Sequence, residues 1–472
     1  MAKTIITGLA VLAFVAALVA AAPMPLSATS PAESEVDKIF AKWTMTTQGC
    51  AVGVAMDGRP VLTKAYGMAD LEHGVKNDAD TIFEAGSVSK QFTAAAILLL
   101  AKDGKLSLDD PARKHIPELP DYGTPLTIRH MMHHMSGLRD WGSVEDIAGW
   151  PRTSRAYTHD HVLDIVSRQK ALNFPPGAQY SYSNTGFNLA AIIVSRVSGM
   201  PFADFTRQRI FTPLGMTRTS WRDDFTRIVP GRAVAYRASG AGFQTQMPFE
   251  NVHGNGGLLT TVGDLLKWNE NFVKPVVGDA AFVSQQQVPG VFSSGKPGSY
   301  AFGLVVGNYR GVKKVDHSGS TAGYRAHLSR FPDQHASVAV LCNVSTGDAT
   351  RSADAVADVY LAGRLAPAPP PPARPADPAP MKNPPTAAQL AELAGSYWSD
   401  EAEVMLIVEV ENGAAVIKRR PAARMPLAPS DTDTFRVAGL GTVTFRRNAA
   451  GKIEGLSVGQ DRVFDMRFTR AN

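Results

Sequence analysis

The amino-acid sequence predicts an α/β (α+β) fold: an antiparallel sheet flanked by helices, with a helical region, followed by a small C-terminal antiparallel β-barrel or sandwich. Strand-like runs lie near both ends of residues 29–365, and helix-like runs lie between them. The tail after residue 385 alternates apolar and polar residues with a period of two. The chain of 472 residues, 44% hydrophobic and 19% charged, is also long enough for more than one domain with its own core.

We interpret residues 29–365 as one mixed α/β domain. Its apolar runs predict strands at 51–56, 324–331 and 336–342, and helices at 91–102, 189–197 and 353–361. Asp57-Gly58 predicts a hairpin turn after the first strand, and Gly104 and Gly199 mark the ends of two helices. Because strands come from both ends of this region, we expect a sheet assembled from distant segments, with a helical region inserted between them.

The composition changes abruptly after residue 365. Residues 366–385 are dominated by Pro and Ala, which predicts an extended, semi-rigid linker. In the module at residues 386–472, an alternating run leads into Glu411-Asn412-Gly413, a strong signal for a short β-hairpin. This pattern indicates a fold rather than an activity, so we expect the module to add stability or to shield a functional site.

The N-terminal residues look like an export signal. Lys3 precedes an Ala-, Leu- and Val-rich stretch at residues 5–22, and small residues suited to cleavage follow at Ala22 and Ala28. We therefore predict a signal peptide at residues 1–28 and a periplasmic or secreted protein. An uncleaved membrane anchor is the alternative, because the stretch is close to the length that spans a bilayer.

The charge of the chain bears on its partners, and its two cysteines bear on a possible disulfide. The formal net charge is +5 and Lys and Arg do not cluster, so neither nucleic acid nor an anionic membrane surface is indicated as a partner. Cys50 and Cys342 each lie in a predicted strand. They would form a disulfide if the two strands pair antiparallel in an oxidising compartment, and two buried thiols are an equal alternative.

Ser87 and Lys90 stand three residues apart at the start of the apolar run 91–102. At that spacing two side chains share one helical face, so an amine lies beside the hydroxyl whose proton a serine nucleophile must lose. The Ser-x-x-Lys pattern also starts at Ser167 and at Ser293. Neither of these opens a buried helix, so only the first pair lies where a rigid scaffold can enclose the amine.

Two later triplets add candidate side chains: Tyr182-Ser183-Asn184 and His317-Ser318-Gly319. They are the only Tyr-x-Asn among 11 tyrosines and the only His-x-Gly among 11 histidines. Taken alone, the first could be a loop tyrosine before a capped helix, and the second a turn at the end of a strand. Together with Ser87 and Lys90, the set is far less compatible with chance.

These motifs, in this order, resemble those of the serine β-lactamase and penicillin-binding protein superfamily. More narrowly, the chain is similar to the class C β-lactamase-related branch, with its D-aminopeptidases, D,D-carboxypeptidases and esterases. The resemblance covers residues 35–365 and includes the segments at 104–111, 126–138 and 256–264. It implies a β-lactamase-like fold for this domain, and the C-terminal module resembles the barrels that some of these hydrolases carry.

The resemblance also bears on cofactors. His130, His133 and His134 lie close together and could suggest a zinc site. In the family this segment is a structural turn after a helix, so the resemblance implies that no metal or organic cofactor takes part.

Catalytic roles follow from the same resemblance. Ser87 would be the nucleophile, Lys90 its proton acceptor, and Tyr182 the group that relays protons to the leaving group and to water. The backbone amides of Ser87 and Ser320 would form the oxyanion hole, where one donor is typically worth about 10²–10³ in rate. Since a free lysine has a pKa near 10.4, a base at neutral pH needs its pKa lowered by roughly three units.

The resemblance also implies which residues bind the substrate, and most of them lie near His317. Ser318, Gly319 and Ser320 would line the substrate, Asn184 would bond its amide, and Arg325 could supply a cation, although an exposed strand arginine is the commoner interpretation. The family's β-lactamases have a lysine where this chain has His317, which is mostly neutral above pH ~6.5. We therefore expect weak or no β-lactam hydrolysis, and a substrate that needs no carboxylate beside the scissile bond.

The sequence thus predicts an exported serine hydrolase that acts through an acyl-enzyme on amide or ester bonds. Its substrates would be peptides with D-residues (D-aminopeptidase or D,D-peptidase type), small amides or small esters. The alternative is a catalytically idle protein that recognises peptidoglycan or a partner through the same cleft. The oligomeric state and any contact with peptidoglycan are left open.

Overall fold

The computed structural model describes residues 30–152, 154–370, 381 and 384–471. The predicted signal peptide at residues 1–28 and 12 of the 20 residues of the predicted linker lie outside this part of the chain. Among the described residues, no single helix has the length and apolarity needed to cross a bilayer; residues 184–198 and 202–211 meet that test only together, as a pair bent by 81°.

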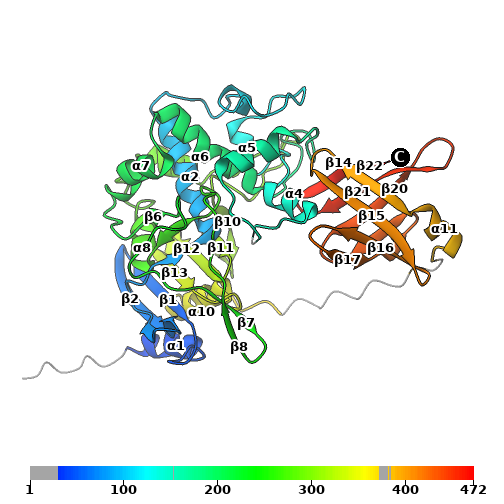
Figure 1. The fold of residues 1–472 in the computed structure, drawn as a ribbon. Helices are drawn as coiled ribbons and strands as arrows, with labels where there is room; N and C mark the ends of the chain where they lie inside the picture. Colours follow the sequence, from blue (N-terminus) through cyan, green and yellow to red (C-terminus); the bar gives the residue numbers. More distant parts are fainter. Residues whose placement is uncertain (1–29, 153, 371–380, 382–383, 472) are drawn as a thin grey trace, which may run out of the picture.

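A six-stranded antiparallel sheet forms the centre of the first domain (Figure 1). Its order is β10 (Val305–Tyr309), β11 (Val312–Thr321), β12 (Tyr324–Phe331), β13 (Ala336–Cys342), β1 (Cys50–Met56) and β2 (Arg59–Tyr66). β1 pairs with β13, so the expected sheet from distant segments is present. Cys50 lies opposite Cys342 in this register, and the two sulfurs form a disulfide.

The sheet has a buried core on each face, because successive side chains of a strand point to opposite faces and both sets are apolar here. Val52 and Val54 pack with α1 (Pro31–Phe40) and α10 (Ala349–Tyr360) on one face. Ala51 and Ala55 belong to the larger core on the other face, which includes α2 (Lys90–Lys102) and α8 (Val262–Glu270). α2 is buried from Lys90 to Leu100, as the apolar run predicts.

The expected helical region lies beside α2 (Figure 1). It contains α3 (Ile128–Met132), α4 (Trp141–Ala148), α5 (His159–Ser167), α6 (Asn184–Ser198), α7 (Phe202–Thr206) and η3 (Arg207–Phe211), with η2 (Ala112–Lys114) before them and α9 (Ala280–Gln286) after α8. α6 begins five residues earlier than the predicted helix, so Asn184 is its first residue and Tyr182 lies just before it.

Three short sheets connect these parts. They are β5 (Phe83–Glu84) with β9 (Leu258–Thr260) and β6 (Ser220–Trp221), β3 (Met68–Asp70) with β4 (Val75–Lys76), and β7 (Tyr236–Ser239) with β8 (Gly242–Thr245). β5 leads directly into the turn that holds Ser87, so its pairing with β9 fixes where that turn begins.

A short 3₁₀ turn, η4 (Pro332–Gln334), follows β12 in the first domain. The C-terminal module begins with α11 (Ala387–Glu392), which is followed by a nine-stranded antiparallel sheet. Its strands are β14 (Gly395–Ser399), β15 (Val404–Glu411), β16 (Ala414–Arg419), β17 (Ala423–Pro426), β18 (Ala428–Asp431), β19 (Thr434–Val437), β20 (Gly441–Arg447), β21 (Ile453–Gln460) and β22 (Val463–Arg470). The edge strands β17 and β18 are consecutive in the chain, so the sheet curls into a nearly closed barrel. Asn412 and Gly413 both have positive φ and form the predicted hairpin turn.

The barrel packs against the helical region near α4 (Figure 1). Arg139 forms a buried ion pair with Glu401, and Asn173 accepts a hydrogen bond from the Phe464 amide at 3.0 Å. The carbonyl of Arg462, between β21 and β22, accepts from the Asp140 amide at 3.3 Å and from Asn173 Nδ2 at 3.0 Å. These contacts hold the β21–β22 hairpin against the segment that leads to Tyr182.

Candidate active site

Ser87 lies in a 3₁₀ turn, η1 (Gly86–Ser89), immediately before α2. Gly86 has φ +51°, a conformation that side chains disfavour, so glycine suits this position. Ser89 Oγ accepts a hydrogen bond from the Leu258 amide at 3.1 Å and ties the turn to β9. The turn therefore presents Ser87 from a rigid base, as a serine nucleophile requires.

Lys90 is fully enclosed behind Ser87. Its Nζ lies 3.1 Å from Ser87 Oγ, 2.9 Å from Asn184 Oδ1 and 2.7 Å from the Asn255 carbonyl. The two amide oxygens can only accept, so a neutral amine can donate one N–H to each and still accept the Ser87 proton with its lone pair. The geometry thus fits a proton acceptor for Ser87.

Electrostatics favour that neutral form. Burial lowers the pKa of Lys90 well below its ordinary value, since a charged ammonium loses its hydration there. The negative charge of Asp140 opposes this shift, whereas the positive charges of Arg152 and Arg462 lower the pKa further. This is the direction of shift that the proposed base requires.

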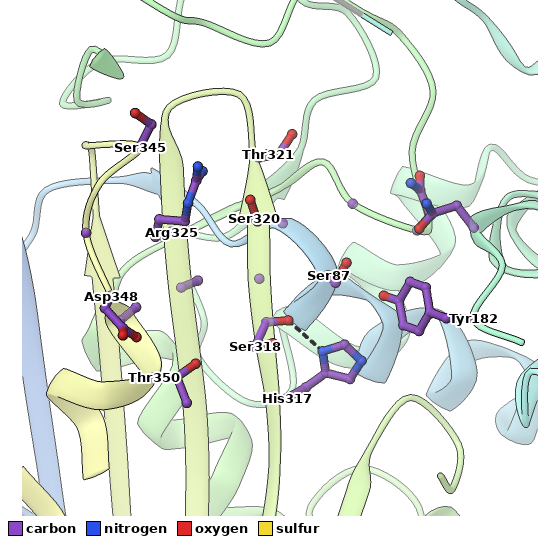
Figure 2. A pocket seen from close by; sticks show the side chains of 18 of the residues that line it. Ser87, Tyr182, His317, Ser318, Ser320, Thr321, Arg325, Ser345, Asp348 and Thr350 are labelled. Carbon is purple, nitrogen blue, oxygen red and sulfur yellow. Dashed lines mark hydrogen bonds between the residues drawn. The ribbon is translucent and has the colours of Figure 1, made fainter. Parts of the chain in front are cut away.

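Tyr182 also lies beside Ser87 and Lys90. Its hydroxyl points toward Ser87 in Figure 2, and its ring centroid lies 4.8 Å from Lys90 Nζ. Burial raises the pKa of Tyr182, so its hydroxyl keeps its proton near neutral pH. The ring packs against His134 with centroids 4.2 Å apart, and His134 Nδ1 accepts from the Ser183 amide at 3.2 Å. His134 thus supports the Tyr182 loop.

His317 is buried with both ring nitrogens engaged. Nδ1 lies 2.6 Å from the Ser318 carbonyl, which can only accept, so Nδ1 carries the proton and Nε2 accepts from the Tyr300 hydroxyl at 2.9 Å. Burial lowers the pKa of His317 to about 4, and nearby Lys90 acts in the same direction. The ring is therefore neutral at physiological pH, so it supplies no positive charge to this site.

β11 and the Ser87 turn approach at backbone contact distance. A Cβ on Gly319 would lie 2.0 Å from the Ala85 carbonyl oxygen and 3.1 Å from the Ser87 nitrogen, and a Cβ on Gly86 would lie 2.6 Å from the Ser320 nitrogen. Only glycine allows this approach. It brings the amides of Ser87 and Ser320 to one wall of the pocket, where an oxyanion hole is expected.

These groups surround a cavity of about 630 Å³. Ser318, Gly319, Ser320 and Asn184 all line it, as the sequence predicts. Arg325 also lines it, at the edge away from Tyr182 (Figure 2), and its Nη1 donates to the carbonyls of Ala322 and Tyr324 at 2.9 and 2.7 Å. The structure thus brings together all the predicted site residues.

Sequence reasoning missed Arg462. Its guanidinium lies 4.8 Å from the Tyr182 ring centroid and lines the cavity, although the residue belongs to the barrel. Nothing in the sequence distinguishes it from the other Lys and Arg residues, 48 in total. Arg152, which lines the cavity and bonds Glu250 at 3.0 Å, and Asn255 were missed as well. Only the neighbouring segment 256–264 was singled out.

The three neighbouring histidines have separate roles. His130 caps the start of α3 through Thr127, His133 lies 3.2 Å from the Arg129 carbonyl, and His134 supports Tyr182. In the part of the chain that the structure describes, no group of three His, Cys, Asp or Glu side chains is arranged to hold a metal ion.

Sequence comparison relates the chain to known proteins. The chain matches the family model described as Beta-lactamase over residues 37–362. It is 31% identical over 332 residues to a D-aminopeptidase of Cereibacter sphaeroides, covering 69% of this chain and 62% of that protein. It is 30% identical over 312 residues to a D-aminopeptidase of Gluconobacter oxydans, covering 66% and 58%. The chain thus spans about three fifths of the length of these relatives.

Solved structures share the fold. An octameric penicillin-binding protein homologue from Pyrococcus abyssi has a TM-score of 0.62 at 24% identity, covering 93% of this chain and 98% of that one. A D-amino acid amidase from Ochrobactrum anthropi, complexed with L-phenylalanine amide, has a TM-score of 0.60 at 24% identity, covering 71% and 100%. The predicted fold class is confirmed, since the first likeness extends over most of the chain.

Proposed function

This chain belongs to the Beta-lactamase family, and on that premise we propose that it is a serine hydrolase that forms an acyl-enzyme on Ser87. The observation that carries the proposal is the enclosed amine of Lys90, 3.1 Å from Ser87 Oγ, with its pKa held down by burial. A binding protein has no physical need for a desolvated amine beside a hydroxyl. A nucleophile does.

The acylation step follows from the positions of these groups. Lys90 accepts the Ser87 proton while Oγ attacks the substrate carbonyl carbon, and the developing oxyanion accepts from the amides of Ser87 and Ser320. Tyr182 delivers a proton to the leaving nitrogen or oxygen as the bond to carbon breaks. Water then attacks the acyl-enzyme, transfers its proton back through Tyr182 and Lys90, and releases the acid with Ser87 protonated again.

We propose peptides with D-residues, or amides and small esters of D-amino acids, as substrates. The names of the relatives from C. sphaeroides and G. oxydans support this class. Since His317 is neutral and hydrogen-bonded on both sides, we assign it a positioning role for β11 and expect weak or no β-lactam hydrolysis. No step requires a metal or an organic cofactor.

Export is part of the proposal. The Cys50–Cys342 disulfide supports it, because such bonds persist mainly in oxidising compartments. The predicted signal peptide agrees with the same location.

A substrate panel tests this function. The protein is assayed with D- and L-alanine p-nitroanilide, p-nitrophenyl acetate and nitrocefin, and intact-mass spectrometry follows acylation by a fluorophosphonate. We expect faster turnover of the D-anilide than of the L-anilide, slow nitrocefin turnover and one label per chain. Ser87→Ala should abolish turnover and labelling.

The chain offers a matched control. Ser167 heads another Ser-x-x-Lys pattern on the exposed end of α5, and its Oγ donates a hydrogen bond to the Asp164 carbonyl at 2.7 Å. Ser167→Ala should keep full activity. Absence of both label and turnover would favour the idle binding protein instead, and nitrocefin turnover exceeding that of the D-anilide would overturn the substrate class.

Arg462 provides a separate prediction. Its positive charge helps to lower the pKa of Lys90, so Arg462→Gln raises that pKa. Because Lys90 must be deprotonated to act, the acid limb of the pH profile of kcat/KM should move to higher pH. Loss of a cation over the Tyr182 ring corresponds to about 0.5–2 kcal/mol, so kcat/KM at neutral pH should fall roughly 2- to 30-fold. Arg467→Gln, on β22 and paired with Asp465, should change neither quantity.

A further inference from the structure

A second cavity of about 800 Å³ lies at the other end of the central sheet. Its walls come from α8 and the loop after it, the β1–β2 hairpin and the ends of β11 and β12. Two arginines of β12 mark the two cavities: Arg330 lines this one and Arg325 lines the active site. They are five residues apart, which at 3.3–3.4 Å per residue separates them by about 17 Å and puts them on opposite faces of the sheet. The cavity is therefore separate from the catalytic pocket.

The distinctive group in this cavity is the Arg330 side chain. It is only 3% exposed, and among the residues that the structure describes no group forms a hydrogen bond with its enclosed Nε and Nη2 atoms. The guanidinium lies 3.6 Å from the Phe272 ring centroid. Burial lowers the pKa of Arg330 to about 9.

Other buried arginines of the chain have carboxylate partners. Arg222 donates to both oxygens of Glu84, at 2.9 and 3.1 Å, and Arg139 pairs with Glu401. A buried cation without such a partner is costly, because it loses its hydration and gains no opposite charge. Arg330 is thus a cation prepared for a partner that the described residues do not supply.

The remaining walls indicate what that partner is. Leu266, Phe272, Val273 and Val276 give the cavity an apolar side, and Val273 and Val276 are 57% and 59% exposed. A guanidinium fork matches a carboxylate with two parallel hydrogen bonds. Asp57 and Glu270 also line the cavity, together with Lys267, Lys274 and Lys313, so side chains of both charge signs surround Arg330.

We propose that this cavity binds a small apolar monocarboxylate, with its carboxylate on Arg330 and its hydrocarbon part along Phe272 and the valines. The ligand class combines the enclosed Arg330 guanidinium, whose fork takes one carboxylate, with the apolar wall beside it. This site is independent of the proposed hydrolase function, because it shares no lining residue with the catalytic cavity.

Isothermal titration calorimetry with octanoate tests the proposal on the full-length protein. We expect one octanoate per chain, with 1-octanol and octylamine at least 10-fold weaker. Arg330→Met and Arg330→Gln should each weaken octanoate at least 10-fold. Lys313→Gln, at the exposed rim of the same cavity, should change the Kd by less than 3-fold and controls for general positive charge.

Thermal unfolding distinguishes a binding site from a structural arginine. If Arg330 serves a ligand, removing its uncompensated charge should raise Tm of the ligand-free protein, and octanoate should raise Tm of the wild type only. Equal octanoate binding by wild type and both variants would overturn the proposal. So would a lower Tm for both variants, which would show that Arg330 supports the fold. Hydrolysis by Ser87 is unaffected in either case.

Discussion

Replacing Lys90 with methionine should lower kcat by about 10⁴-fold or more, nearly as much as Ser87→Ala. The two residues act as one unit, since the hydroxyl is a weak nucleophile until its proton has an acceptor 3.1 Å away. The double variant Ser87→Ala, Lys90→Met should therefore be little worse than either single variant. Methionine has a similar length and suits an enclosed apolar site, so the variant should fold.

Measurement of kcat and kcat/KM on the D-alanine anilide, beside circular dichroism of the folded variants, checks this expectation. Additive losses in the double variant would show that Lys90 does not act through Ser87. A folded Lys90→Met protein with more than a tenth of wild-type activity would remove Lys90 from the mechanism.

The pH profile carries a related test. A lowered pKa means that Lys90 is deprotonated at lower pH than a free lysine, so activity is present above that pKa and is lost as pH falls through it. The pKa of His317 is about 4, so its ring stays neutral in this range. His317→Asn should therefore lower the rate without removing the acid limb. Loss of the limb in that variant would assign it to the imidazole.

Gly319→Ala should lower kcat by about 10²–10³-fold while the protein remains folded. The new Cβ would lie 2.0 Å from the Ala85 carbonyl oxygen, so β11 must move away from the Ser87 turn. That movement separates the Ser87 and Ser320 amides, which should act on the oxyanion of the transition state more than on the ground-state carbonyl. KM should consequently change much less than kcat.

A boronic acid that mimics the tetrahedral intermediate gives an independent readout, because its affinity should fall in parallel with kcat. Gly307→Ala is the matched control: Gly307 lies on neighbouring β10, and open space surrounds the added Cβ. It should behave as wild type. Normal kcat in folded Gly319→Ala would show that the close approach of the two backbones is not needed for catalysis.

Much of the fold could be predicted from sequence because its signals are local. The apolar run after Lys90 forms buried α2, and Asn412-Gly413 forms the hairpin that its turn preference indicates. The sequence leaves the disulfide open, since it depends on whether two strands about 290 residues apart are paired. Register alone decides that, and the structure places Cys50 opposite Cys342.

The site could be predicted only where short spacing carries chemistry. Ser87 and Lys90 are close in sequence, and the triplets at Tyr182 and His317 are rare enough to notice. Arg462 and Arg330 gave no such signal. Arg462 matters because the barrel packs against the first domain, and Arg330 because surrounding elements bury its side chain. Whether an arginine lies over a tyrosine ring or loses its partners is decided by how distant elements pack, and no local pattern encodes it.

The pairing of β1 with β13 also has a consequence for biosynthesis. Residues 50–56 emerge early from the ribosome, but their neighbour at 336–342 is made only after most of the domain has been synthesised. Until then the nascent chain can form the β1–β2 hairpin but leaves the other edge of β1 open. The sheet can therefore be completed only late in synthesis of the first domain, and a chaperone that covers an apolar strand edge would act during this interval.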